Sequence, residues 1–218
     1  MGLNYIDHAT ESSMTPPSEP VLFFKATTSI CGAYDPVVIP SGSRKTDWEV
    51  ELGVVMARTA RRVTVAQALD HVGGYLIVND LSERESQLER GGQWVKGKSY
   101  DTFGPIGPWL VTRDEVPDPS ALSLWLSVNG QVCQDGNTRN MIFNVPTLIS
   151  YISQFMTLLP GDIISTGTPS GVGLGMKPPR YLRPNDLMEL GVEGLGTQRH
   201  RTVAEITETS DFRLPNSG

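Results

Sequence analysis

The stretch Asp47-Trp48-Glu49-Val50-Glu51-Leu52-Gly53-Val54-Val55-Met56 is the segment around which this chain is organised. Its apolar side chains alternate with the others, and this period of two predicts a half-buried β-strand. One face is apolar and belongs against a core. The other face carries Glu49 and Glu51, whose Cα atoms lie roughly 7 Å apart at strand rise and repel one another. Either water solvates both glutamates, or a hard divalent cation such as Mg²⁺ or Mn²⁺ neutralises them.

Length and composition are those of an ordinary soluble globular protein. With 218 residues, 39% hydrophobic and 19% charged, a single domain over residues 1–218 is expected, ending in a polar tail over 209–218. The formal net charge of −6 argues against nucleic acid or an anionic membrane as partner. The sequence contains no apolar run of about 18 residues, so no membrane-spanning helix is predicted, and no signal-peptide pattern is visible. Cys31 and Cys133 form no disulfide framework, which suits a cytoplasmic protein.

The first 20 residues predict a short polar helix followed by a loop. His8 and Glu11 are three positions apart, so on one helical turn they share a face and can hydrogen-bond. Three prolines between positions 16 and 20 then exclude a helix. Residues 1–20 are therefore a candidate lid segment. The alternative for His8 and Glu11 is a surface pair without function.

A fully apolar run over residues 75–78 predicts a central strand. Asp80 lies just after the C-terminal end of this strand. Residues 82–87 predict a short helix, so Asp80 is either the N-cap of that helix or a ligand.

Residues 92–99 match the phosphate-loop pattern GxxxxGK[ST] letter for letter. Such a loop needs a hydrophobic strand before it and a helix after it. The preceding residues are polar, and Pro105 and Pro108 exclude a helix of useful length. A nucleotide site is therefore rejected, and Lys98 remains as a lysine set among glycines and aromatics.

Several further patterns complete the expected fold. Asn129-Gly130 between two alternating segments predicts a hairpin, and a second hairpin is expected over residues 187–203. The apolar stripe over residues 145–159 predicts a core helix with Asn144 as its cap. The glycine-rich segment 166–173 either brings backbone N–H groups close to a ligand or is a flexible loop.

Together these pieces resemble the fumarylacetoacetate hydrolase family over nearly the whole chain. The matching motifs are Asn4-Tyr5, His8-Ala9-Thr10-Glu11, Asp47-Trp48-Glu49-Val50-Glu51-Leu52, Asn79-Asp80, Arg84 with Gln87, Gly97-Lys98-Ser99-Tyr100-Asp101, Pro105-Ile106-Gly107-Pro108, Val128-Asn129-Gly130, Leu159-Pro160-Gly161-Asp162 and Thr166-Gly167-Thr168-Pro169. Each motif is weak alone, but their order and spacing are hard to obtain by chance. Shorter family members carry some tens of residues before the histidine motif, so a truncated N-terminus is one expectation here.

The resemblance implies a mixed-β fold with peripheral helices (α+β), in which strands roll barrel-like around a central site, usually in a homodimer. It also implies one Mg²⁺ or Mn²⁺ per chain, held by Glu49, Glu51 and Asp80. If these residues bind a metal, Glu49 and Glu51 do not simply face water, and Asp80 is not simply a helix N-cap. Because no acidic residue precedes Asp7, the three-carboxylate version of the family's site is expected.

The resemblance further implies that His8 and Glu11 form a catalytic dyad on a lid over the metal. Lys98 is expected to be the third catalytic residue and to contact the substrate. The expected substrate-binding residues are Arg84, Gln87, Gly167 and Thr168.

The expected reaction is hydrolysis of a C–C bond in a 2,4-dioxo acid of the acylpyruvate or fumarylpyruvate type. His8, oriented by Glu11, would activate the attacking water, and Lys98 would neutralise the developing oxyanion. The same site would serve isomerisation of hydroxy-diene dioates or decarboxylation of β-keto acids such as oxaloacetate in aromatic catabolism, or ureidoglycolate lysis. Two other classes stay open: a metal-free aldolase with Lys98 as Schiff base, and a non-catalytic binding protein.

Overall fold

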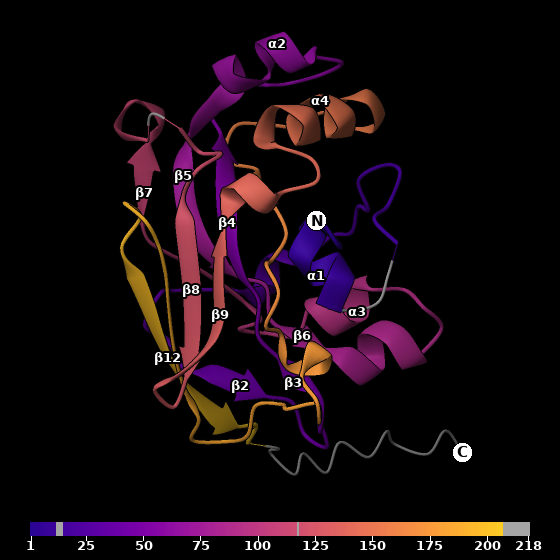
Figure 1. The fold of residues 1–218 in the computed structure, drawn as a ribbon, viewed down its shortest axis with the longest axis vertical. Coiled ribbons are helices and arrows are strands. Elements are labelled where there is room, and N and C mark those ends of the chain that lie inside the picture. Colours follow the sequence, from indigo (N-terminus) through magenta and orange to yellow (C-terminus); the bar gives the residue numbers. More distant parts are fainter. Residues whose placement is uncertain (12–14, 117, 207–218) are drawn as a thin grey trace, which may run out of the picture.

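The computed structural model describes residues 1–11, 15–116 and 118–206. The expected tail over residues 209–218 lies outside these ranges, as do three residues of the expected lid segment. Strands dominate the fold and curl into a half-barrel, with the few helices at its periphery (Figure 1). The predicted α+β class is therefore confirmed.

The first sheet has five strands in the order β1-β7-β5-β4-β10. Their bounds are β1 Ile30–Cys31, β4 Val50–Met56, β5 Val72–Asn79, β7 Gly104–Thr112 and β10 Ile163–Ser165. β4 was expected to be half-buried, but six of its seven residues are buried. The reason is that strands β8 (Ser123–Val128) and β11 (Leu187–Val192) of the other large sheet contact it. Arg84 and Lys98 also cover Glu49, which lies just before β4.

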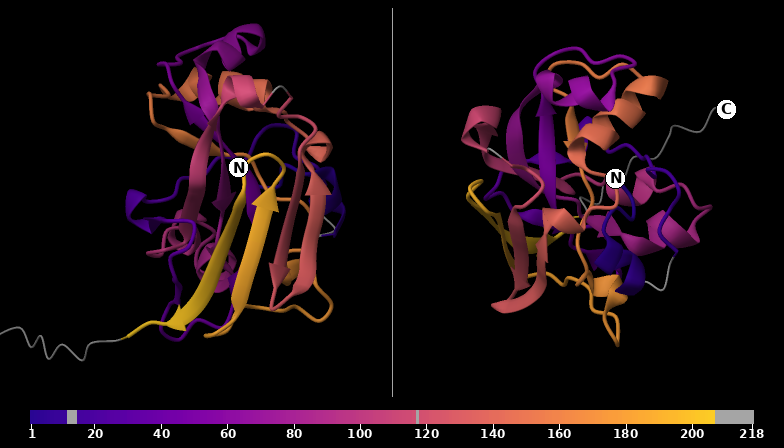
Figure 2. Two further views of the ribbon diagram at one scale, coloured as in Figure 1. Left: turned by 90° about the vertical axis from the view of Figure 1, so that its left-hand side faces the viewer. Right: turned by 45° about the horizontal axis from the view of Figure 1, so that its top comes forward.

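The second sheet also has five strands, in the order β2-β12-β11-β8-β9, seen side by side in the left view of Figure 2. Their bounds are β2 Val37–Ile39, β8 Ser123–Val128, β9 Gln131–Asn137, β11 Leu187–Val192 and β12 Thr197–Ala204. Both predicted hairpins are confirmed. In the first, Asn129 and Gly130 take φ angles of 53° and 78°, the left-handed pair that this turn requires.

The remaining elements are short. The helices are α1 Ile6–Glu11, α2 Val65–Ala68, α3 Val95–Lys98 and α4 Val145–Phe155, and β3 Thr46–Asp47 pairs with β6 Ser82–Glu83. Short helical turns cover Thr27–Ser29, Leu69–His71, Glu85–Glu89, Arg113–Glu115, Thr138–Asn140 and Gly173–Gly175. The helix predicted over residues 82–87 is thus replaced by β6 and a π-helical turn. Within the described residues, no helix has the length and apolar character to cross a membrane.

Helix α4 begins as predicted but ends early. The Asn144 side chain accepts a hydrogen bond from the Thr147 N–H at 3.1 Å, as a helix cap does. The helix ends at Phe155 rather than at residue 159. Two backbone hydrogen bonds of 2.9 Å join Leu158 and Ala60 in a β-bridge, and this pairing requires extended backbone.

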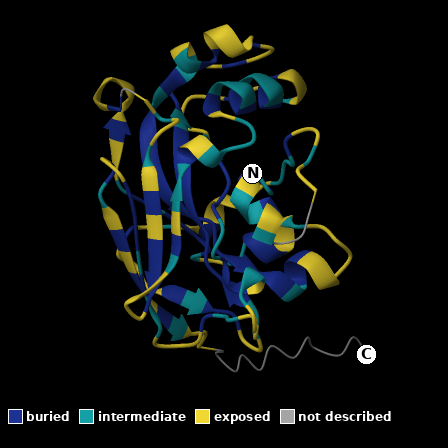
Figure 3. Ribbon diagram, viewed as in Figure 1, coloured by how far each residue is buried: buried dark blue, intermediate teal, exposed yellow. Residues whose placement is uncertain are grey.

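Buried apolar side chains from both large sheets form one core. Figure 3 colours the buried residues of these strands dark blue. Leu52 of β4 is fully buried in it. We expect Leu52→Ala to lower the free energy of unfolding by about 2–5 kcal/mol, through lost burial and a residual cavity. Urea denaturation measures this value. Val132→Ala on the exposed edge strand β9 is the control and should change stability by less than about 0.5 kcal/mol. Equal effects would contradict the placement of the core.

Candidate metal centre and active site

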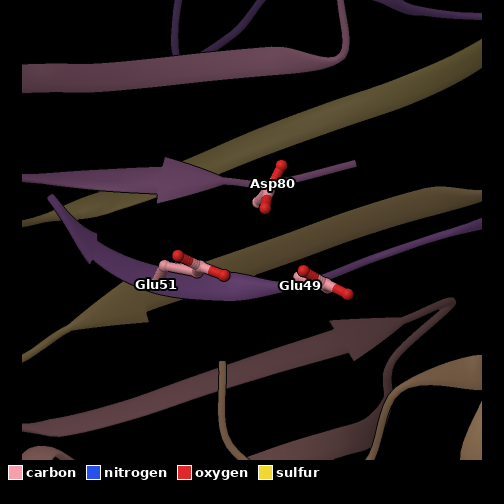
Figure 4. A group of neighbouring side chains, drawn as sticks. All are labelled: Glu49, Glu51 and Asp80. Atoms are coloured by element: carbon pink, nitrogen blue, oxygen red, sulfur yellow. The ribbon is translucent and has the colours of Figure 1, made fainter. Parts of the chain in front are cut away.

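Antiparallel pairing of β4 with β5 gathers the three predicted carboxylates. Val50 lies opposite Asn79, and the Asp80 N–H donates to the Glu49 carbonyl at 2.8 Å, so Glu49 and Asp80 are neighbours across the strands. Glu51 lies two residues along the same strand (Figure 4). One oxygen from each carboxylate lies within 4.8 Å of the others, and all three side chains are buried. The residues expected to hold a metal therefore converge on one point.

Basic side chains offset most of this buried negative charge. The Lys98 ammonium lies 2.7 Å from Glu49 Oε2 and 2.9 Å from Asp80 Oδ2. Lys25 lies 2.7 Å from Asp80 Oδ1, and Arg84 lies 2.8 Å from Glu49 Oε1. Although burial opposes ionisation of Asp80, the Lys25 and Lys98 charges hold the pKa of Asp80 far below its usual value. Burial likewise opposes the charge on Lys98, but Asp80 and Glu49 raise the pKa of Lys98.

Glu51 is less well compensated than its neighbours. Its Oε2 accepts hydrogen bonds from the Ser165 hydroxyl at 2.6 Å and the Gly167 N–H at 2.7 Å. Its Oε1 is buried without a hydrogen-bond partner among the described residues. Burial raises the pKa of Glu51 to about 7. A divalent cation fits here, because it would engage the orphaned oxygen and prefers carboxylate ligands.

The predicted dyad lies on α1. His8 Nδ1 is 3.6 Å from Glu11 Oε2, so the two residues face one another as the spacing predicted. Glu11 is in turn held by the Gly171 N–H, which lies 3.0 and 3.1 Å from its two oxygens. This contact fixes the side chain that faces the histidine.

His8 of the dyad and Glu49 of the acidic cluster both line one cavity of about 100 Å³. Six of the predicted site residues line it: His8, Glu49, Arg84, Gln87, Lys98 and Thr168. The rest of the wall comes from Met1, Gly2, Leu3, Leu88, Trp94 and Leu174. The cavity therefore has one polar, charged side and one largely apolar side.

Four predicted site residues do not line this cavity. Glu51, Asp80 and Glu11 support those that do. Gly167 was expected to present its backbone to the substrate, but its N–H donates to Glu51 instead. Thr168 does reach the cavity, and its hydroxyl donates to the Val50 carbonyl at 2.9 Å.

Three further residues take part that the sequence analysis did not single out. Lys25 pairs with Asp80, Asp47 pairs with Arg84 at 2.8 Å, and the Gln134 amide donates to Thr168 Oγ1 at 2.8 Å. Asp47 is the first residue of the stretch Asp47–Met56, so its place in that motif could have marked it as a site residue. Lys25 and Gln134 follow ordinary strand-like segments and carry no local signal.

A larger groove of about 560 Å³ lies between α4, β10 and the segment around Phe23. Its wall is mostly apolar, and it approaches the acidic cluster through Lys25 and Ser165. Neither member of the dyad lines it. The smaller cavity is therefore the one that His8 and most of the predicted site residues line.

Comparison with known proteins agrees with this geometry. The model of the fumarylacetoacetate (FAA) hydrolase C-terminal family matches residues 1–203. A protein of Burkholderia multivorans, whose name says no more than hydrolase, is 62% identical over 205 residues, which is 94% of this chain and 73% of that protein. The chain belongs to the fumarylacetoacetate hydrolase family.

Solved structures of similar proteins carry more specific names. Fumarylacetoacetate hydrolase from Exiguobacterium antarcticum is 41% identical, with a TM-score of 0.86 over 93% of this chain and 73% of that one. A 2-hydroxyhepta-2,4-diene-1,7-dioate isomerase from Mycobacterium marinum is 39% identical, with a TM-score of 0.81 over 93% and 72%. Maleylpyruvate hydrolase from Sphingobium sp. SYK-6, solved with manganese and pyruvate, is 34% identical, with a TM-score of 0.79 over 94% and 69%. The family thus includes both hydrolases and isomerases.

We expect Glu51→Gln to weaken Mn²⁺ binding by more than about tenfold, because it removes an anionic ligand from the only carboxylate of the three with an orphaned oxygen. Titration calorimetry with MnCl₂ measures the affinity. Glu189→Gln, on an exposed part of β11, is the matched control and should bind Mn²⁺ like the parent protein. An unchanged affinity in Glu51→Gln would exclude Glu51 as a ligand.

Proposed function

We propose that this chain hydrolyses a C–C bond in a 2,4-dioxo acid and that Glu49, Glu51 and Asp80 hold Mg²⁺ or Mn²⁺ for this reaction. One observation carries the proposal: His8, which faces Glu11, and Glu49, which belongs to the buried carboxylate cluster, line the same cavity from different parts of the chain. When bound, the cation would supply Lewis-acid polarisation of the substrate's 2-oxo acid end. The hydrolase and isomerase names among the relatives support this substrate class.

His8 is the general base in this proposal. Its Nδ1 faces Glu11, which leaves Nε2 to take a proton from a water molecule in the cavity. That water adds to the C4 carbonyl of the substrate. The C3–C4 bond then breaks, its electron pair goes to C3, and C3 is protonated. The products are a carboxylic acid and pyruvate.

Lys98 and Arg84 supply the fixed positive charge. Both line the cavity, and both are anchored by buried carboxylates, so neither must reorganise when negative charge develops on the substrate. The same anchoring weighs against a Schiff-base mechanism, which needs a neutral lysine of lowered pKa. The pKa of Lys98 is instead raised by Asp80 and Glu49, which outweigh its burial.

The apolar side of the cavity favours an uncharged acyl group on the substrate. Of the described side chains that line the cavity, only those of Lys98, Arg84 and His8 can carry positive charge, and the lysine and arginine already pair with carboxylates. The N-terminal ammonium of Met1, which also lines the cavity, donates to the Ser165 carbonyl at 2.8 Å. The opposite wall includes Leu88, Trp94 and Leu174. A second carboxylate on the substrate would lie there without a partner, at a large desolvation cost. We therefore place acylpyruvates ahead of fumarylpyruvate.

A second candidate is isomerisation or decarboxylation at the same centre. The similarity to a 2-hydroxyhepta-2,4-diene-1,7-dioate isomerase favours it. Decarboxylation needs no water attack at C4, so it depends less on His8, whereas isomerisation still needs a group that moves a proton.

We expect His8→Ala to reduce kcat for acetylpyruvate hydrolysis by at least about 100-fold, because the general base is lost. Loss of the substrate's ultraviolet absorbance follows the reaction in the presence of Mg²⁺ or Mn²⁺. His71→Ala, which changes a histidine outside the cavity, is the control and should retain activity. Retained hydrolysis in His8→Ala would exclude the proposed base. Hydrolysis that persists in EDTA would exclude the metal.

We expect kcat/KM for acetylpyruvate to exceed that for fumarylpyruvate by at least about tenfold, because the distal wall offers no free cation to a second carboxylate. Parallel assays of the two substrates at one metal concentration give the ratio. A ratio near one, or a reversed ratio, would contradict this assignment of the apolar wall. Turnover of a hydroxy-diene dioate without any hydrolysis would favour the isomerase instead.

A further inference from the structure

The turn Gly171–Gly175 lies beside α1 and receives the carboxylate of the dyad. The Gly171 N–H lies 3.0 and 3.1 Å from the two Glu11 oxygens. A Cβ atom added to Gly175 would lie 2.5 Å from Glu11 Cδ and 2.6 Å from Glu11 Oε2. The Glu11 carboxylate therefore occupies the room that the missing side chain of Gly175 leaves. This turn is the seat of Glu11.

Asp47 and Trp48 hold the seat from the other side. Asp47 Oδ1 accepts the Gly173 N–H at 2.7 Å, and Asp47 Oδ2 accepts the Leu174 N–H at 2.9 Å. The Trp48 indole N–H donates to the Gly171 carbonyl at 3.1 Å. Both side chains are fully buried. The two residues before the di-glutamate strand thus fix the turn on which Glu11 rests.

Asp47 also holds the arginine of the cavity. Arg84 Nε donates to Asp47 Oδ2 at 2.9 Å, and a second nitrogen of its guanidinium lies 2.8 Å from the same oxygen. Arg84 continues to Glu49 Oε1 at 2.8 Å and lines the cavity. The buried carboxylate of Asp47 therefore contacts both the seat of Glu11 and Arg84, a charged residue of the cavity.

We propose that Asp47 is a positioning residue. It fixes the position of the Gly171–Gly175 seat, and through it that of the Glu11–His8 pair, relative to Arg84. The inference rests on the proposed function, in which His8 is the base. Asp47 itself does not line the cavity and acts through Glu11 and Arg84. The coupling explains why an acidic residue stands two positions before the first predicted ligand.

The chemistry of the contacts requires aspartate rather than asparagine. Oδ1 accepts from the N–H groups of Trp48 and Gly173, and Oδ2 accepts from Leu174 and Arg84. Whichever way an asparagine turned, its NH₂ group would face donors and leave them unpaired. If the NH₂ group replaced Oδ1, Asp47→Asn would lose the hydrogen bond from Gly173 in the seat. If it replaced Oδ2, the hydrogen bonds from Leu174 in the seat and from Arg84 would both be lost.

Amide hydrogen exchange of α1 tests the seat without any substrate. We expect Gly175→Ala to speed exchange in α1 by about tenfold, because its Cβ displaces Glu11, while exchange in β4 and β5 stays unchanged. The same substitution in a Glu11→Ala background should have no further effect, because the three nearest neighbours of the added Cβ are all Glu11 atoms. An effect of equal size in both backgrounds would mean general damage and would overturn the seat.

Asp47→Asn tests the positioning role. We expect Asp47→Asn to speed amide exchange in α1 by about tenfold and to lower kcat for the 2,4-dioxo acid. In the double variant Asp47→Asn/Gly175→Ala, we expect the effects of the two substitutions on amide exchange to be less than additive. Unchanged exchange in α1, or full additivity, would overturn the role of Asp47. If Asp47→Asn fails to fold, Trp48→Phe, which removes only the indole donor to Gly171, replaces it with the same expectations. Coupled exchange in a protein that hydrolyses no 2,4-dioxo acid would refute the proposed function and leave the seat standing.

Discussion

Burial of three carboxylates within 4.8 Å of one another is the constraint on which the rest of this site depends. Isolated buried charges are prohibitively costly, so each must be paired, bind a cation or take up a proton. Lys25, Lys98 and Arg84 meet this need for Asp80 and Glu49. Glu51 keeps an oxygen without a hydrogen-bond partner among the described residues, and there the demand for a cation is greatest.

The same charges organise the site beyond the acidic cluster. Arg84 spans Glu49 and Asp47, and Asp47 reaches the turn that receives Glu11. The strand that carries the candidate ligands is therefore linked by direct contacts to the helix that carries the candidate base. A site built this way holds its polar groups in place before substrate arrives, which is the condition for electrostatic catalysis.

Much of the fold could be predicted because its signals are local. Alternation marked β4, an apolar run marked β5, and Asn129-Gly130 marked a hairpin. Signals that depend on pairing were not visible. The register that sets Glu49 beside Asp80 is a long-range property, so spacing alone did not decide whether Asp80 is a helix cap or a ligand. Likewise, the bridge of Leu158 to Ala60 shortened a helix whose apolar stripe continued.

Anomalous diffraction at the manganese edge, from crystals of this protein grown with MnCl₂, tests the central claim most directly. The account predicts one strong peak per chain, within coordination distance of one oxygen each of Glu49, Glu51 and Asp80. A peak elsewhere, or none while Lys98 keeps its place between Glu49 and Asp80, would contradict it.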